Sequence, residues 1–323
     1  MKYRKLGKTD LNVSEISLGC WTLGGVSWDK GKSAGWADVD EKEAIEAINY
    51  GMEKGVNHFD NADTYGNGKA ERMLAKALGT KSKQIIIATK IGHVKGTAEH
   101  AYEPAHIRHQ CEQSLINLKR DYIDLYYFHH GDFGPDDIYV DGAVDMMNKL
   151  KKEGKIRWLG LSAYSENDFL RLSPKIKPNV LQSWGNITDD QFLRNGKPVA
   201  ELMKKDGLSF VAFSPLAQGL LLGKFSSKNP TVFAEGDHRK NDQRFTPAEI
   251  AKLEPKVDKL KQKFGSEIKD LSRVALQYIL SYDITGCVIP GFRNKKQVEM
   301  NLQAADRPLT AEEVKYIKDV FAS

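Results

Sequence analysis

The chain has 323 residues, of which 41% are hydrophobic and 28% are charged, and 48 Lys and Arg against 43 Asp and Glu give a net charge of +5. A chain of this size buries roughly three quarters of its unfolded surface, and its balanced composition excludes disordered, collagen-like and coiled-coil proteins. Because the basic residues are spread along the chain rather than clustered, we expect no nucleic-acid partner.

Three widely spaced cysteines, Cys20, Cys111 and Cys287, predict reduced thiols in a cytoplasmic protein. They form no CxxC pair and have no histidine at ligand spacing, so we expect no metal site. Residues 1–19 lack the apolar segment of a signal peptide, and no apolar run approaches the roughly 18 residues needed to cross a bilayer. We therefore expect no membrane association.

Eight short apolar runs alternate along the chain with longer amphipathic stretches. Their continuous apolarity is typical of strands that are covered on both faces. The runs are Ile16–Gly19, Val56–Phe59, Ile85–Thr89, Ile123–Phe128, Trp158–Leu161, Val180–Gln182, Phe210–Phe213 and Cys287–Ile289. The stretches between them carry helical spacing, such as Ile107, Cys111, Leu115 and Leu118. Eight strand–helix units in this length predict an α/β protein with a single (β/α)₈ TIM barrel.

Two segments interrupt the alternation. Residues 2–13, with a turn at 7–10, predict an N-terminal hairpin that caps the bottom of the barrel. The segment between Phe213 and Cys287 is much longer than the other connections and predicts a long loop region after strand 7. Connections of this length are usually functional or mobile. No repeat, low-complexity tract or linker divides the chain, so we expect one domain over residues 1–323.

Polar side chains of different chemical types follow the predicted strands. Asp60 follows the second strand, Lys90 the third and His129 the fourth, and Tyr65 lies five residues beyond Asp60. Because the carboxyl ends of barrel strands meet on one face, we expect these groups to converge there. An ammonium next to a phenol lowers the pKa of the phenol, so Lys90 is expected to make Tyr65 a proton donor. The imidazole of His129 is expected to hydrogen-bond a substrate oxygen.

Six ordered sequence blocks make the chain resemble the aldo-keto reductase superfamily along most of its length. They are residues 59–66 (FDNADTYG), 88–90 (ATK), 122–129 (YIDLYYFH), 160–162 (GLS), 213–221 and 289–301. The resemblance implies a barrel that binds NADP(H) without a Rossmann domain. It also implies a catalytic tetrad of Asp60, Tyr65, Lys90 and His129. In that tetrad Tyr65 protonates a carbonyl oxygen while a hydride moves from C4 of the nicotinamide to the carbonyl carbon.

The resemblance also assigns the contacts to the cofactor. Ser162 and Gln182 would hold the nicotinamide carboxamide, and Phe213 would stack on the ring. The remaining residues assigned to the cofactor are Cys20, Trp21, Ser214, Leu216, Gln218, Gly219 and Gly291, and Trp21 and Trp28 are assigned to the substrate pocket. Two departures from the commoner pattern, Ala163 and Met300, affect cofactor contacts rather than chemistry.

One end of the cofactor site is also supported by the spacing of residues. Arg293, Gln297 and Asn301 are spaced at i, i+4 and i+8, which places them on one face of a helix after the last strand. A helix N-terminus with an arginine suits a phosphate group. Since the resemblance gives these positions to the 2′-phosphate, NADPH is expected rather than NADH.

The expected activity is the reversible, NADPH-dependent reduction of an aldehyde, ketone or sugar-type carbonyl. Two alternatives stay open at this point. The chain could be a cofactor-bound regulatory subunit resembling the channel β-subunits of the same superfamily, or Lys90 could form a Schiff base with a substrate. The sequence leaves the oligomeric state, the direction of reaction and the physiological substrate open.

Overall fold

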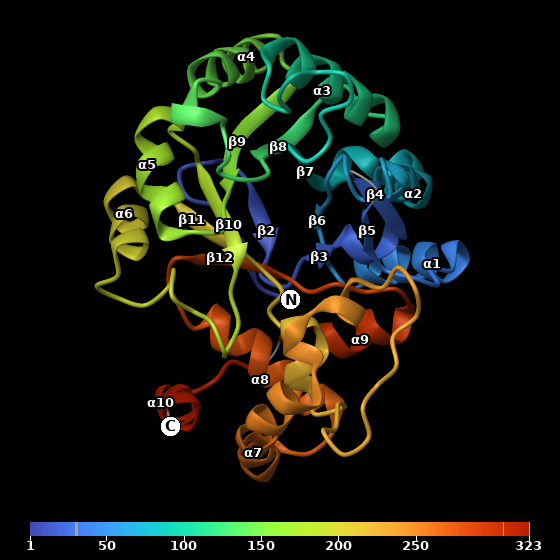
Figure 1. The fold of residues 1–323 in the computed structure, drawn as a ribbon, viewed down its shortest axis with the longest axis vertical. Helices are drawn as coiled ribbons and strands as arrows, with labels where there is room; N and C mark the ends of the chain where they lie inside the picture. The colour runs from blue at the N-terminus through green and yellow to red at the C-terminus, as the bar shows by residue number, and fades with distance from the viewer. Residues whose placement is uncertain (30–31, 306, 323) are drawn as a thin grey trace.

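Eight parallel strands form a closed barrel, which confirms the predicted fold class (Figure 1). The computed structural model describes residues 1–29, 32–305 and 307–322, with the side chains of 28–34 outside that description. The strands are paired in chain order, and bridges from Ile16 to Val288 and from Gly19 to Gly291 join the last strand to the first. They are β3 (Leu18–Gly19), β6 (His58–Asp60), β7 (Ile86–Ile91), β8 (Ile123–Phe128), β9 (Ile156–Ser162), β10 (Val180–Trp184), β11 (Ser209–Phe213) and β12 (Thr285–Ile289).

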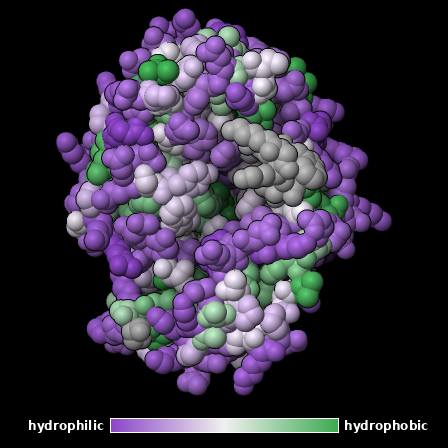
Figure 2. Space-filling view, viewed as in Figure 1, coloured by the Kyte–Doolittle hydropathy of each residue, from purple (hydrophilic) through white to green (hydrophobic). Residues whose placement is uncertain are grey.

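A ring of helices covers the outside of the barrel. In chain order the ring contains α1 (Glu41–Glu53), α2 (Lys69–Leu78), α3 (Pro104–Leu118), α4 (Val140–Lys152), α5 (Glu166–Ile176), α6 (Pro198–Asp206), α8 (Ile268–Leu280) and α9 (Lys295–Leu302). Two further helices, α7 (Pro247–Phe264) and α10 (Ala311–Ala322), contact each other beyond α8. On the face shown in Figure 2, the exposed side chains are mostly hydrophilic. None of the helices in the described part has the length and apolarity required to span a bilayer.

Side-chain caps fix where several of these helices begin. Asp40 accepts a hydrogen bond from the backbone N–H of Glu43 at the start of α1, and Ser165 does the same for Asp168 at the start of α5. Such caps satisfy N–H groups that have no partner within the helix. The local sequence therefore sets where the helices that pack on the barrel begin.

The predicted N-terminal hairpin is present and closes the bottom of the barrel. Strands β1 (Tyr3–Lys5) and β2 (Asn12–Ser14) pair antiparallel. Leu6, Leu11 and Val13 are buried and join the cluster of side chains that fills the barrel interior, whose other members are Ala88, Leu125, Tyr127, Val180, Val211, Cys287 and Ile289. The barrel is thus a packed core, and only its opposite end is available for a site.

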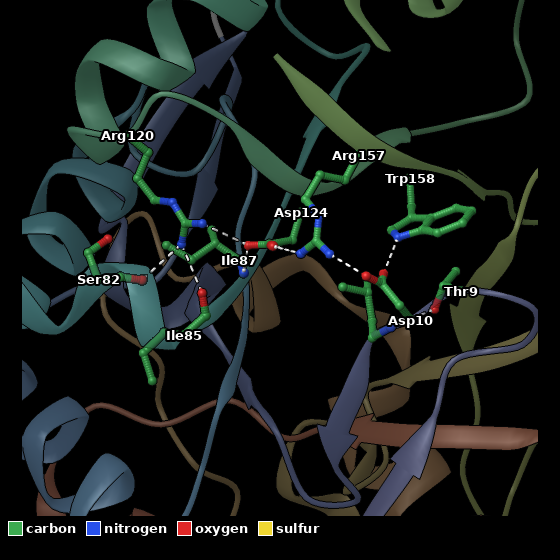
Figure 3. Close-up of polar contacts among 10 residues, drawn as sticks. Thr9, Asp10, Ser82, Ile85, Ile87, Arg120, Asp124, Arg157 and Trp158 are labelled. Carbon is green, nitrogen blue, oxygen red and sulfur yellow. Dashed lines mark hydrogen bonds and ion pairs between the residues drawn. The ribbon is translucent and has the colours of Figure 1, made fainter. Parts of the chain in front are cut away.

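Charged side chains tie the hairpin to the barrel (Figure 3). Asp10, in the hairpin turn, accepts hydrogen bonds from Arg157 at 2.6 Å and from Trp158 Nε1 at 2.7 Å. Arg157 also contacts Asp124 at 2.6 Å, and Asp124 contacts Arg120 at 3.0 Å. Arg120 in turn donates to the carbonyl oxygens of Ser82 and Ile85. Because Asp124 and Arg120 are both buried, this part of the network is shielded from water.

Two connections on the upper face are more structured than expected. After β3, strands β4 (Val26–Asp29) and β5 (Lys32–Gly35) form a second hairpin that the sequence did not reveal. The long region after β11 is only partly a loop. It contains the short helices η4 (Ala217–Leu222), η5 (His238–Asn241) and η6 (Gln243–Phe245) before α7 and α8.

Candidate functional site

A cleft of about 690 Å³ lies at the carboxyl ends of the barrel strands. Figure 2 shows the hollow near the centre of this face, with hydrophobic side chains at its base. Its wall includes Asp60 from β6, Gln182 from β10, Phe213 from β11 and Ile289 from β12. A concave, largely apolar site with a few polar groups at its base is the usual form of a ligand pocket.

The structure brings Asp60, Tyr65, Lys90 and His129 together at the base of this cleft. Lys90 forms an ion pair with Asp60, and its Nζ donates to the backbone oxygen of Asn61 at 2.6 Å and to Tyr65 Oη at 3.3 Å. The rings of Tyr65 and His129 lie with their centroids 5.9 Å apart. Lys90 is only 1% exposed, so its charge acts on Tyr65 with little screening by water.

The pKa of Tyr65 differs from the sequence-based expectation. Burial, followed by the negative charge of Asp60, raises the pKa of Tyr65 well above its usual value. The expectation of a lowered pKa is wrong, because burial and the negative charge of Asp60 outweigh the effect of the Lys90 ammonium. Tyr65 is consequently protonated at neutral pH. It gives up its proton only to a strongly basic oxygen.

The imidazole of His129 is neutral in this environment. Burial, followed by the positive charges of His93 and Lys90, lowers the pKa of His129 well below its usual value. Its Nδ1 is buried and finds no hydrogen-bond partner among the described residues. The adjacent His130 points elsewhere, and its Nε2 lies 2.8 Å from the backbone oxygen of Gly92. One histidine of the pair therefore faces the cleft.

The residues assigned to the nicotinamide lie around this base in different ways. Gln182 lines the cleft, and its Nε2 donates to Asp60 Oδ2 at 2.8 Å. Phe213 and Trp21 line the cleft, whereas Ser162 and Cys20 are buried and are not among its lining residues. The hydroxyl oxygen of Ser162 has no hydrogen-bond partner within the described part of the chain. The side chain of Trp28, predicted for the substrate pocket, lies outside the described residues.

The segment after β11 has an unusual backbone where it borders the cleft. Ser214, Leu216, Gln218 and Gly219 all line the cleft, as the resemblance implies. Ser214, Ala217 and Gln218 have positive φ angles of 51°, 46° and 56°. Such conformations cost about 1–3 kcal/mol each and cluster at ligand sites. The buried Oε1 of Gln218 also lacks a partner among the described residues, which leaves it available to a ligand.

Basic side chains line the outer part of the cleft. Arg293 Nη1 donates to the backbone oxygen of Ala37 at 3.3 Å, and its own backbone N–H donates to Gln297 Oε1 at 2.7 Å. Asn301 is buried with its Nδ2 unpartnered within the described residues. Three further cations line the same cleft, namely Lys224, Arg239 and Lys296. Gly291 also lines it, next to Thr22.

These cations crowd one another. Burial, followed by the positive charges of Arg239 and Arg293, lowers the pKa of Lys224. Arg239 is partly neutralised by Asp237 at 2.6 Å, but no such partner is among the lining residues around Arg293. The expected helix N-terminus is partly occupied, because Asn294 accepts from the backbone N–H of Gln297. A phosphate would therefore be attracted more strongly by the arginine and lysine side chains than by the N-terminus of α9.

Several lining residues were missed by the sequence analysis. They are Trp36, His93, Tyr164, Lys224 and Arg239. His93 lies just beyond the end of β7, so the rule that strand ends carry site residues could have found it. Trp36 and Lys224 lie in irregular connections, and Arg239 lies in the short helix η5 of the long region after β11. Their sequence positions indicate no approach to the cleft.

Comparisons with known proteins identify the family of the chain. The model of the aldo/keto reductase family matches residues 15–322. The uncharacterized oxidoreductase YqkF of Bacillus subtilis is 30% identical, covering 98% of this chain and 96% of its own. L-Galactose dehydrogenase of Arabidopsis thaliana is 28% identical, and the match covers 94% of this chain and 88% of that protein.

Solved structures give the same result. The glycerol dehydrogenase AKR11B4 from Gluconobacter oxydans superimposes with a TM-score of 0.81 at 27% identity, covering 99% of this chain and 95% of that one. The holo form of aldo-keto reductase AKR11C1 from Bacillus halodurans superimposes with a TM-score of 0.75 at 29% identity. The match covers 99% of this chain and 96% of that one. The protein is an oxidoreductase on a (β/α)₈ barrel. It belongs to the aldo/keto reductase family, whose members generally use nicotinamide cofactors.

Proposed function

We propose that this protein is an NADP(H)-dependent reductase that reversibly converts an aldehyde, ketone or sugar-type carbonyl into an alcohol. The observation that carries the proposal is the partly buried Tyr65 phenol, whose Oη lies 3.3 Å from Lys90 Nζ at the base of the cleft. A phenol in this setting is suited to protonate an oxygen on which negative charge develops.

Each of the four groups has a distinct task in this proposal. Tyr65 transfers its proton to the carbonyl oxygen, and Lys90 stabilises the phenolate that remains. Asp60 pairs with Lys90 and orients it, and Gln182 is the second hydrogen-bond donor to Asp60. His129, being neutral, positions the carbonyl oxygen by a hydrogen bond. A nicotinamide cofactor, when bound, would supply the hydride for the carbonyl carbon.

Partnerless buried polar atoms support a dinucleotide along the cleft. Ser162 and Gln182 would hold the carboxamide, Phe213 would stack on the nicotinamide ring, and Gln218 would face the pyrophosphate. The partnerless atoms of Ser162, Gln218 and Asn301 fit such a ligand, because buried polar groups are normally hydrogen-bonded. Arg293 and Lys224 suit a 2′-phosphate, which NADPH carries and NADH lacks.

The contacts of Lys90 favour this reaction over Schiff-base chemistry. A Schiff-base lysine attacks as a neutral amine. Lys90 Nζ instead contacts the carboxylate of Asp60, a backbone oxygen and the Tyr65 hydroxyl, so it is already engaged by protein groups. We therefore assign Lys90 to electrostatic stabilisation.

The substitution Tyr65→Phe tests the proposed function. It removes the proton donor but keeps the ring, so kcat for carbonyl reduction should fall by about 10²–10⁴. The dissociation constant of NADPH, measured by fluorescence titration, should change by no more than about threefold. Turnover close to that of the unmodified enzyme would contradict the assignment. A wild-type protein that binds NADPH but turns over no compound in a broad carbonyl panel would support a regulatory role instead.

A further inference from the structure

We propose that Tyr127 is a positioning residue for the proton donor, because its ring supports Lys90 from inside the barrel and keeps the ammonium against Tyr65. The inference rests on the proposed carbonyl reduction and adds a residue to that same site. It comes from the register of the barrel strands, in which Tyr127 stands between Lys90 and Gly160.

The hydrogen-bond partners of Lys90 all lie on one side of it. An ammonium has three N–H donors. Here they point to Asp60, to the backbone oxygen of Asn61 and to Tyr65 Oη. These acceptors belong to β6 and to the connection that follows it, whereas β7, which carries Lys90, lies between β6 and β8. The side of Lys90 that faces β8 therefore depends on a different kind of contact.

The ring of Tyr127 covers this second side. Tyr127 is the cross-strand neighbour of Lys90 on β8, and its ring centroid lies 6.0 Å from Lys90 Nζ. The ring centroid of Tyr65 lies 5.1 Å from the same atom, so two aromatic rings flank the ammonium. Cation–π contacts are stronger where water is excluded, and both Lys90 and Tyr127 are almost completely buried. The ammonium is thus held from below as well as by its hydrogen bonds.

Gly160 makes room for this ring. It is the neighbour of Tyr127 on β9, and a Cβ atom at this position would overlap ring atoms Cδ1 and Cε1 of Tyr127. Barrel interiors are normally filled by side chains from the strands, and here the ring of Tyr127 fills the space that a side chain at position 160 would take. This close fit holds the ring in one place, as a supporting contact requires.

Tyr127 acts through Lys90 and not on the substrate, since it is fully buried and is not among the residues that line the cleft. Burial, followed by the negative charge of Asp60, raises the pKa of Tyr127 well above its usual value, so the ring carries no charge. Gln182 opposes this rise, but the Tyr127 hydroxyl forms no hydrogen bond of ordinary geometry with the described residues. Removing the hydroxyl alone therefore leaves the support of Lys90 in place.

Replacing the ring tests its role. Tyr127→Leu lets Lys90 move away from Tyr65, so kcat should fall by about tenfold with NADPH and the carbonyl compound that the wild-type enzyme reduces fastest. The dissociation constant of NADPH should stay within about threefold. Tyr127→Phe keeps the ring and should retain at least about a third of the wild-type kcat. Tyr126→Leu, at an equally buried tyrosine that faces the helices on the same strand, is the matched control and should keep kcat close to the wild-type value.

The pH dependence of alcohol oxidation separates positioning from a general loss of stability. Oxidation with NADP⁺ needs Tyr65 as the phenolate, which Lys90 stabilises, so in Tyr127→Leu the rise of kcat should move to higher pH by about half a unit or more. Asp60 and Asp63, whose charges raise the pKa of Tyr65, are unchanged in this variant. A residue that only fills space would lower Tm without moving this rise. If Tyr127→Leu fails to fold, Tyr127→Met, with a flexible side chain that fills irregular gaps, should show the same two changes.

The inference is overturned if the Leu and Met variants of Tyr127 keep the wild-type kcat and pH profile. It is also overturned if Tyr127→Phe is as impaired as Tyr127→Leu, because the hydroxyl would then matter instead of the ring, or if Tyr126→Leu shows the same changes. These outcomes leave the proposed function intact. A wild-type protein that reduces no carbonyl compound contradicts the proposed function, and the inference with it.

Discussion

Asp60 links the groups around Tyr65 into one hydrogen-bonded unit. Its two carboxylate oxygens accept from Lys90 and from Gln182 respectively. A buried carboxylate is stable only when it is paired in this way. Gln182, which the sequence assigned to the cofactor alone, therefore also supports the side chain that orients Lys90. If Gln182 contacts both Asp60 and the cofactor, it would couple the position of the cofactor to the orientation of Lys90 and Tyr65.

A second buried acid lies close to Tyr65. Burial, followed by the charge of Glu71, raises the pKa of Asp63 to about 8. Asp63 is therefore mostly protonated at neutral pH, and its ionisation in mildly alkaline solution adds negative charge near Tyr65. That charge is one of the causes that raise the pKa of Tyr65.

The preference for NADPH is a prediction at the scale of one residue. Arg293→Leu removes a guanidinium from the basic part of the cleft and should raise the dissociation constant of NADPH by about 10- to 100-fold, as expected for a hydrogen-bonded charge. The dissociation constant of NADH should change by less than about threefold. Arg244→Leu, at an arginine paired with Asp242 and not among the lining residues, is the control. Equal losses for both cofactors would mean that the 2′-phosphate is held elsewhere.

At the scale of elements, the strands were easier to predict than the connections. All eight predicted runs are barrel strands, since a continuous apolar run must be covered on both faces. Their ends moved by up to two residues, for example in β9, which begins at Ile156 rather than Trp158. The β4–β5 hairpin was missed because residues 26–35 contain no apolar run.

The strained segment after β11 gives a prediction for one connection. Gln218→Gly suits the positive φ of 56° at this position and removes a buried, unpartnered Oε1 atom from a residue that lines the cleft. In thermal melts the free protein should change in stability by less than about 1 kcal/mol, whereas the rise in Tm caused by NADPH should shrink.

Gly219→Ala provides the contrast. Gly219 has a φ of 97°, and an added Cβ would lie 2.8 Å from Lys224 Cε. Alanine is strained here, so the free protein itself should lose stability. If Gln218→Gly leaves the NADPH-induced rise in Tm intact, the segment does not hold the cofactor through this side chain.

At the scale of the whole molecule, the two ends of the barrel have separate tasks. The cleft lies at the carboxyl ends of the strands, and the hairpin with its charged network closes the amino ends. This separation allows the stability of the fold and the chemistry of the site to be changed independently. The charged network at the amino ends of the strands therefore contributes to the stability of the fold rather than to the chemistry of the site.

Asp124→Ala tests the contribution of the lower network to stability. It leaves the buried guanidinium of Arg120 without its carboxylate, and should lower the free energy of unfolding by about 3–5 kcal/mol. Asp10→Ala removes a more exposed partner of Arg157 and should cost about 1 kcal/mol or less. Urea denaturation measures both values. Similar losses for the two variants would show that burial does not set the strength of this network.

The sequence by itself determined the barrel, its N-terminal hairpin and the strand ends at which Asp60, Lys90 and His129 stand. It could do so because apolar periodicity is local and because parallel strands must end on the same face. Only the tertiary structure decided the protonation of Tyr65, the pairing of Gln182 with Asp60 and the approach of His93 to His129. These depend on burial and on the distances between charges far apart in sequence, and no local pattern encodes either quantity.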